Sequence, residues 1–197
     1  MPTQLPRRLR GSVELRSERG AGLTAVISAD EWVLAPLGGL STFGNEVALQ
    51  VRKAKIEAVD EVLWSARIFE SLCSALHPVH GTVYACDEYD AKNMSHEGGR
   101  LEATGVDASK HLPGLYWLNF FGRAYCDFIG RDRLLASPAA EVREVGDGVL
   151  LRLADDPRMW RSSEYKAVEE RVLNHIGGQY FFSKDHPNRE TVAPSFA

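Results

Sequence analysis

The sequence lacks a long apolar run and an excess of positive charge. No stretch is apolar over the length that a membrane-spanning helix needs. Lysine and arginine number 23 against 27 aspartates and glutamates, giving a formal net charge of -4. This sign is wrong for a domain that neutralises phosphates. We therefore expect neither a membrane nor a nucleic acid as a partner.

Cysteine is also scarce, with three residues at positions 73, 86 and 126. An odd number in a chain long enough to bury a core without disulfides favours reduced thiols in the cytoplasm. Cys73 lies on the apolar stripe of a predicted helix and Cys86 near the end of a predicted strand, so we expect both to be buried. Arg7, Arg8 and Arg10 are followed by no apolar stretch, so we expect no secretory signal.

Signature motifs of enzymes are missing. The sequence contains no GxGxxG after a strand, no Walker motif, no GxSxG, no HExxH and no paired CxxC. His77 and His80 straddle a proline, and no second pair of ligands at zinc spacing accompanies them. We therefore expect no catalytic residue, cofactor or metal. Instead, His77 should cap a helix end and His80 should pack at the start of a strand.

The composition that remains is that of an ordinary globular protein. The chain is 44% hydrophobic and 25% charged, which excludes a disordered, collagen-like or coiled-coil protein. No Pro/Gly/Ser-rich linker interrupts the middle of the chain. We expect a single domain over 1–197, with a flexible arm at 1–10 and an irregular tail at 183–197.

Two segments have helical periodicity. Apolar residues recur at spacings of three and four from Val59 to Leu76, and the helix should end before His77-Pro78. A second helix is predicted from Ser163, with Gly177-Gly178 ending it. A shorter helical region is expected over about 124–136, interrupted by Gly130.

The other segments read as strands and turns. Alternating or β-branched runs predict strands over 12–17, 23–28, 46–52, 79–86 and 114–121. Asp147-Gly148 between apolar runs predicts a hairpin, and Pro36 with Gly38-Gly39 predicts an edge or a bend. Residues 92–112 are polar and predict a long surface excursion. The fold class is α+β, an antiparallel or mixed sheet with two long helices packed mainly on one face.

Side chains with chemistry gather after the strand over 79–86. Asp87, Glu88, Tyr89 and Asp90 predict a solvated acidic loop, and acid–base catalysis or the docking of a basic partner are the functional alternatives. Docking ranks above catalysis. The candidate contact surface combines these four residues with the excursion that contains His96 and His111.

The most aromatic stretch, GLYWLNFF at 114–121, predicts core instead of a ligand cage. Asn119 alternates with these aromatics. Its amide must therefore face solvent or find hydrogen-bond partners within the sheet.

Three segments have a distinctive order: the turn Pro78 to Gly81, the strand Gly114 to Gly122, and the hairpin Gly146 to Leu151. Together they resemble bacterial immunity-type proteins associated with type VI secretion and polymorphic toxins. The resemblance covers roughly residues 60–157, about half of the chain. It implies a small cytoplasmic protein without catalytic activity that binds a cognate toxin and blocks the toxin's active site or assembly.

Two other function classes stay open. A pocket between sheet and helices that uses His80, Asp87 or Cys126 would make the chain a small-ligand-binding protein or an enzyme. Exposed strand edges and aromatics would instead suit a structural role as a homo-oligomer, such as a homodimer.

Overall fold

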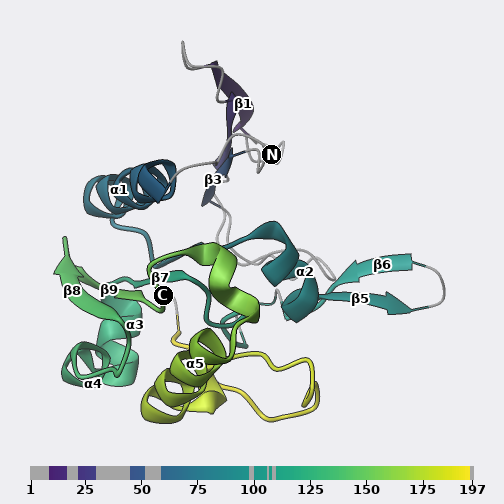
Figure 1. Cartoon of the computed structure of the whole chain (residues 1–197), viewed down its shortest axis with the longest axis vertical. Coiled ribbons are helices and arrows are strands. Elements are labelled where there is room, and N and C mark those ends of the chain that lie inside the picture. The colour runs from purple at the N-terminus through teal and green to yellow at the C-terminus, as the bar shows by residue number, and fades with distance from the viewer. Residues whose placement is uncertain are drawn as a thin grey trace, which may run out of the picture. The chain divides into compact units, whose positions relative to one another are not determined.

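The computed structural model describes residues 9–16, 22–29, 45–51, 59–97, 100–105, 107 and 110–195 (Figure 1). The chain divides into two compact units, residues 1–61 and 62–197. The single domain expected from the sequence stays a prediction.

The first unit contains a three-stranded antiparallel sheet in the order β1-β2-β3. Its strands are β1 (Leu9–Arg16), β2 (Gly22–Ala29) and β3 (Asn45–Val51). The strands predicted over 12–17, 23–28 and 46–52 are confirmed. The strand β1 begins inside the arm expected over 1–10, and the bend expected at Pro36 lies outside the described residues.

The helix α1 (Val59–Leu76) has the bounds that its periodicity predicts. The residue that follows its last turn, His77, has a left-handed φ of 48°. The N–H of His77 donates to the carbonyl of Cys73 at 3.2 Å. This bond closes the helix end as a left-handed cap does. The predicted capping role of His77 is confirmed, and its ring Nδ1 lies 3.3 Å from Asp147 Oδ1.

The second unit is built on a four-stranded sheet in the order β4-β7-β9-β8, with every pair antiparallel. The strands are β4 (His80–Val83), β7 (Leu118–Phe121), β8 (Glu141–Val145) and β9 (Gly148–Arg152). The predicted hairpin is confirmed, but its two-residue turn is Gly146-Asp147, one residue earlier than the predicted Asp147-Gly148, with a φ of 56° at Gly146, and Gly148 already pairs with Val145. The strands predicted over 79–86 and 114–121 are shorter in the structure. The strand β4 is followed by a helix that begins at Cys86, and the residues before β7, 114–117, are buried but lie outside the β-ladder.

The sheet is covered on both faces. On one face Phe120, Val145 and Leu150 pack with Cys73 and Phe69 of α1. On the other, the larger core cluster joins strand residues to α5 (Ser163–Ile176) and to three short helices. The strand residues of this cluster are Phe121, Val149 and Leu151, and the α5 residues are Tyr165, Val172 and Ile176.

The α+β class with an antiparallel sheet is confirmed, but the two long helices lie on opposite faces of the sheet and not mainly on one. The physical reason is that β7 and most of β9 are buried at consecutive positions, as both burial patterns show. A strand that alternates is covered on one face, whereas a continuous apolar run needs cover on both.

The predicted short helical region is confirmed and has three parts. They are α3 (Arg123–Tyr125), the π-helical turn η2 (Cys126–Gly130) and α4 (Arg131–Leu135). Gly130 has a φ of 104°, which explains why the helical pattern is interrupted there. The helix α5 is confirmed as well, with Ser162 accepting a hydrogen bond from the N–H of Tyr165 and Gly177 ending it at a φ of 120°.

The amide of Asn119 does not face solvent and finds hydrogen-bond partners in the core, which is one of the two alternatives predicted from the sequence. It is fully buried, and its amide pairs with the backbone of Tyr116. Its Oδ1 accepts from the Tyr116 N–H at 2.9 Å and its Nδ2 donates to the Tyr116 carbonyl at 2.7 Å. The aromatic run around it is core, as predicted: Tyr116, Trp117, Phe120 and Phe121 are each 0% exposed.

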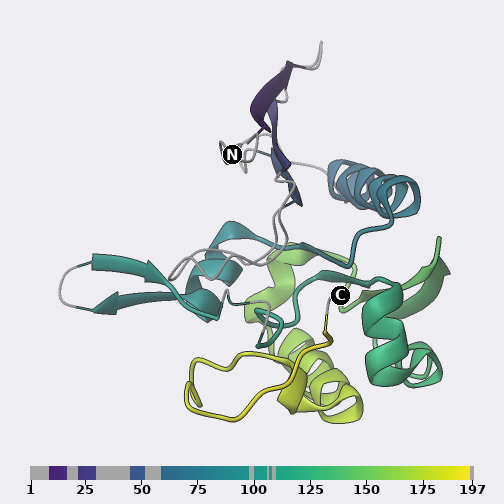
Figure 2. The ribbon, with the colours of Figure 1, turned by 180° about the vertical axis from the view of Figure 1, so that it is seen from behind.

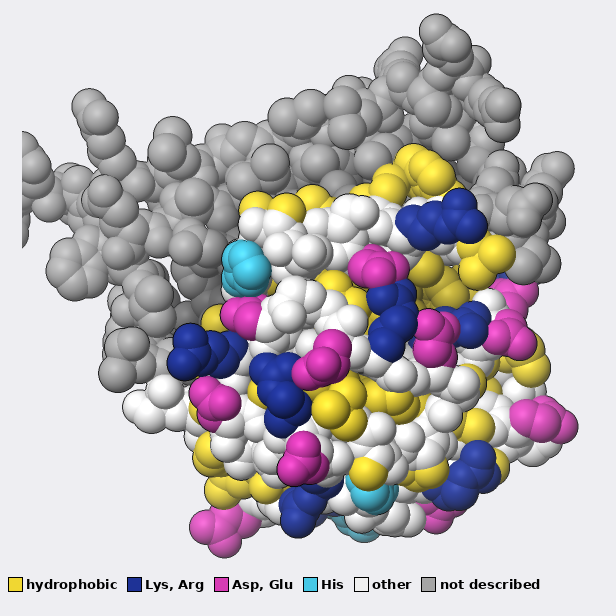
Figure 3. All heavy atoms as spheres, turned by 90° about the vertical axis from the view of Figure 1, so that its left-hand side faces the viewer, with side chains coloured by type: hydrophobic (Ala, Val, Ile, Leu, Met, Phe, Trp, Pro, Cys, Tyr) yellow, Lys and Arg dark blue, Asp and Glu magenta, His cyan; other side chains and the backbone are white. Residues whose placement is uncertain are grey.

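The outer edge of the sheet carries a chain of ion pairs. Arg143 on β8 pairs with Glu70 of α1 and with Glu141, and Glu141 also pairs with Arg152 of β9. Figure 3 shows charges of both signs interspersed over this side of the molecule. Charged side chains of this kind protect an edge strand against pairing with another chain.

The pair of Arg143 with Glu70 gives a pH-dependent prediction. The Arg143 hydrogen bond lowers the pKa of Glu70 below 4.5. A group whose pKa is lowered by folding contributes to stability above its unfolded-state pKa. This contribution is lost as pH falls through its folded-state pKa. Because both side chains are about one-third exposed and solvent screens them, we expect Arg143→Met to lower the free energy of unfolding by at most about 1 kcal/mol at pH 7.

Urea denaturation at pH 7 and pH 3 checks this prediction. The difference between wild type and variant should be smaller at pH 3, because the unfolded chain binds a proton at Glu70 below about 4.5 and must release it to form the pair. Arg123→Met is the control, since Arg123 is exposed and lies 3.8 Å from Asp127. An unchanged difference at the two pH values would contradict the role of Glu70.

Candidate partner-binding site

The acidic segment after β4 is a helix and not the loop expected from the sequence. The helix α2 (Cys86–Asn93) begins with the N–H groups of Glu88 and Tyr89 donating to the carbonyl of Ala85 at 2.8 and 3.1 Å. Carboxylates in its first turn compensate the positive end of the helix dipole. Cys86 opens this helix and is exposed, so the expectation of a buried thiol there is wrong.

Glu88 points inward from α2 and is 0% exposed. Its Oε1 accepts from Lys92 Nζ and from the hydroxyl of Tyr165, both at 2.7 Å. The same ammonium lies 2.8 Å from Glu169 Oε1 and donates to the carbonyl of Leu115 at 2.6 Å. These contacts join α2 to α5, so Glu88 holds the helix in place and does not offer its carboxylate to a partner.

Tyr89 belongs to a group of three tyrosines. Its ring stacks on Tyr84 with centroids 4.9 Å apart and lies 6.2 Å from the ring of Tyr116. Tyr116 is fully buried, and its hydroxyl donates a short hydrogen bond to Asn93. Tyr84, by contrast, is 39% exposed. The stack therefore runs from the core to the surface.

Asp87 and Asp90 lie three residues apart on α2 and so share one side of the helix. Asp87 pairs with Arg161 at 2.7 Å, and the guanidinium of Arg161 lies 4.1 Å from the ring centroid of Trp160. These contacts connect α2 to the 3-10 helix η3 (Pro157–Arg161). We define the α2 surface by Tyr84, Asp87, Tyr89, Asp90, Trp160 and Arg161.

The two histidines predicted as contact residues lie in different parts of the excursion. His96 is in β5 (Met94–Glu97), which pairs with β6 (Arg100–Ala103) in a hairpin that continues from α2 (Figure 2). His111 is partly buried, with Nδ1 3.1 Å from the hydroxyl of Thr191. Burial lowers the pKa of His111, and the residue ties the excursion to the tail instead of facing outward.

The three residues of the alternative pocket each have different neighbours. His80 opens β4 as predicted, against Phe121 and Tyr125, and burial lowers its pKa to about 4. The thiol of Cys126 donates to the carbonyl of Phe121 at 3.1 Å, and burial raises its pKa. Asp87 lies on α2 and pairs with Arg161 of η3. A neutral imidazole and a protonated thiol are poorly suited to acid–base or nucleophilic work at neutral pH.

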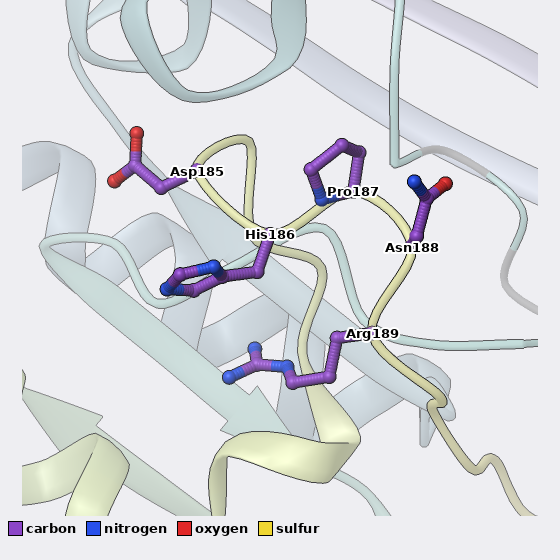
Figure 4. Close-up of a pocket in the computed structure, with 5 residues that line it drawn as sticks. All are labelled: Asp185, His186, Pro187, Asn188 and Arg189. Carbon is purple, nitrogen blue, oxygen red and sulfur yellow. The ribbon is translucent and has the colours of Figure 1, made fainter.

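Two depressions lie elsewhere on the unit. One, of about 520 Å³, is formed by residues 185–189 of the tail (Figure 4), where the side chains of His186 and Arg189 extend in the same direction. The other, of about 350 Å³, lies between the end of α1 and α3 and is lined by His77, Arg123, Asp127 and Asp147 among others. Neither depression includes a residue of the α2 surface, and neither includes Glu88, Lys92, Tyr165 or Glu169.

Comparison with known proteins identifies no relative: the chain matches no protein-family model, no curated protein and no solved structure. Within the described ranges, no three His, Cys, Asp or Glu side chains are grouped so as to hold a metal ion. In the same part of the chain, none of the helices is both long and apolar enough to pass through a lipid bilayer.

Sequence reasoning missed the residues that hold α2 in place. The spacing of four between Glu88 and Lys92 is a helical signal that was available. Arg161, Tyr165 and Glu169 follow more than 70 residues later, and no local pattern connects them to α2.

Proposed function

We propose that this protein is a non-catalytic binding module of the cytoplasm that docks on a cognate bacterial toxin and neutralises it. The partner would sit on the α2 surface and block the toxin's active site or its assembly. The observations that carry this proposal are the tyrosine stack that reaches the surface at Tyr84, and the contact of Asp87 with Arg161, whose guanidinium is stacked on Trp160.

The chemistry of the α2 surface supports a protein partner. Tyrosine, tryptophan and arginine contribute most of the binding energy in protein interfaces. Here Tyr84 is stacked on Tyr89, and Arg161 is stacked on Trp160. Because these side chains are already ordered by their neighbours, less conformational entropy is lost when a partner binds.

The carboxylates indicate the charge of the partner. Asp87 and Asp90 lie on the outer side of α2, and the chain as a whole carries a net charge of -4. A basic segment on the toxin would be attracted by this charge, which mainly accelerates association. Of the contact residues predicted from the sequence, Asp87, Tyr89 and Asp90 belong to the α2 surface, and His96 on β5 stays a prediction outside it. Glu88 and His111 leave the proposal, because the one lies beneath the surface and the other contacts the tail.

The resemblance to immunity-type proteins supports a toxin as the partner. Its motifs fall in the turn before β4, in the segment that ends with β7, and in the β8–β9 hairpin. These are parts of the sheet and of the segments that lead into it, and not of the α2 surface itself. The resemblance therefore indicates the class of partner and leaves the identity of the toxin to experiment.

The test is co-expression with the product of a large toxin-like or secretion-associated reading frame beside this gene. We expect the full chain to restore growth of cells that express the toxin, and to be recovered with it in a pull-down. A chain that neither restores growth nor binds the toxin tightly would rule out the proposal. A neighbourhood without such a reading frame would count against it as well.

A pair of matched variants tests the location of the interface. Tyr84→Ala is expected to raise the dissociation constant about tenfold or more, as truncation of an aromatic hot spot does. Phe128→Ala is the control, because Phe128 is 40% exposed and its ring also contacts a tyrosine, Tyr180, at 5.5 Å. Calorimetry with the purified toxin measures both, and equal effects of the two changes would exclude the α2 surface.

A further inference from the structure

The cluster between α2 and α5 contains two carboxylates and one ammonium. Glu88 and Glu169 approach Lys92 Nζ at 2.7 and 2.8 Å. The Glu88 side chain is fully buried, and that of Glu169 is 18% exposed. With both carboxylates ionised, the cluster holds one negative charge in excess. Burying an unbalanced charge is costly, and a protein commonly reduces that cost by binding a proton.

The two oxygens of Glu88 differ in their surroundings. Oε1 accepts hydrogen bonds from Lys92 and from Tyr165. Oε2 is also buried but has no hydrogen-bond partner. An ionised carboxylate with one unpartnered oxygen forfeits part of the solvation that it had in water. Oε2 is therefore the atom at which a proton would be bound.

We propose that Glu88 is a proton-binding switch that sets how firmly α2 is held against α5. The proton site stands on the geometry of the cluster. Its consequence for a partner rests on the proposed function, since Asp87, Tyr89 and Asp90 of the α2 surface lie on the helix that Glu88 anchors.

The direction of the switch follows from the groups that face Glu88. These are Lys92 on α2, Tyr165 and Glu169 on α5, and Tyr116 in the segment before β7. Burial raises the pKa of Glu88 above 4.5, Glu169 raises it further, and Lys92 and Tyr165 oppose the rise. When folding raises the pKa of a group, the free energy that the group contributes to stability is fully present below its unfolded-state pKa. That contribution is lost as pH rises through its folded-state pKa. The helix α2 is therefore held most firmly in mild acid.

Carbon NMR of the protein labelled at glutamate carboxyl groups tests the proton site, with Glu88→Gln assigning the signal. We expect the Glu88 signal to titrate with a midpoint above 4.5. Glu169→Gln should shift this midpoint downward, because it removes the second carboxylate. Glu144→Gln is the control, since Glu144 is exposed on β8 beside Arg131 and should leave the midpoint unchanged. A midpoint at or below 4.5, or one that Glu169→Gln does not lower, would overturn the proposal.

Hydrogen exchange tests the effect on α2. After correction for intrinsic rates, protection of the α2 amides should fall relative to that of α5 as pH rises through the midpoint. In Glu88→Gln the ratio of the two protections should not change with pH. Parallel changes in both helices would show that Glu88 does not control α2. Neither experiment needs a partner, so a failure here is distinguishable from a failure to find a toxin, which concerns the proposed function alone.

Discussion

Replacing Gly122 with alanine is expected to lower the free energy of unfolding by about 3 kcal/mol or more. A Cβ at this position would lie 2.1 Å from the carbonyl oxygen of Pro78 and 2.8 Å from that of Val79. Both are backbone atoms, and the second is held in place by a hydrogen bond from the Gly122 N–H at 2.9 Å. The connection between α1 and β4 would have to move away from the end of β7.

Urea denaturation followed by circular dichroism measures this effect. Gly178→Ala is the matched control, because the nearest atom to its added Cβ is Nη1 of Arg189, at 3.1 Å, the end of a flexible side chain. We expect this control to change stability by less than about 1 kcal/mol. Similar losses in the two variants would show that steric contact at Gly122 is not the cause.

Replacing Asn119 with leucine is expected to cost about 3 kcal/mol, although both side chains branch at Cγ and have the same number of non-hydrogen atoms. The change removes both hydrogen bonds to Tyr116 and leaves its N–H and carbonyl unpaired in the core. Unpaired buried groups of this kind forfeit their hydration without compensation. Thermal and urea unfolding measure the loss.

Asn174→Leu is the control for this experiment. Asn174 is exposed on α5, so the same substitution there should change the free energy of unfolding by less than about 0.5 kcal/mol. If Asn119→Leu were as mild, the two hydrogen bonds to Tyr116 would not contribute to the stability of the sheet.

The elements predicted best are those whose signals are local. The helix α1 follows from a stripe with spacings of three and four, and α5 follows from the same periodicity and a glycine stop at Gly177. The β8–β9 hairpin follows from Asp147-Gly148 between apolar runs, although the turn lies one residue earlier, with the positive φ at Gly146. In each case a few neighbouring residues determine the conformation, so a single sequence contains the information.

The helix α2 was missed because its stability depends on distant residues. Its eight residues have little amphipathic character, and a short helix without packing is marginal in water. It forms here because Glu88 and Lys92 contact Tyr165 and Glu169, which arrive more than 70 residues later in the chain. The candidate site was therefore located in the correct segment and given the wrong conformation, with one of its acids directed inward.

The prediction that the two long helices pack mainly on one face of the sheet was wrong for a related reason. The run GLYWLNFF shows that its residues are buried, but a continuous apolar stretch does not say which element covers which face. That assignment depends on Phe120 facing α1 and Phe121 facing α5, and it appears only when all the elements are assembled.

A sheet covered on two faces sets an order of events during synthesis. Once residue 152 has been made, all four strands are present, and α1 can already cover Phe120 and Leu150. The opposite face, with Phe121, Val149 and Leu151, is covered only by the short helices over 123–135 until α5 is complete at Ile176. A nascent chain at this stage therefore presents a paired sheet with one apolar side partly exposed, the kind of surface that chaperones bind. The last quarter of the chain completes folding as well as contributing Arg161 to the α2 surface.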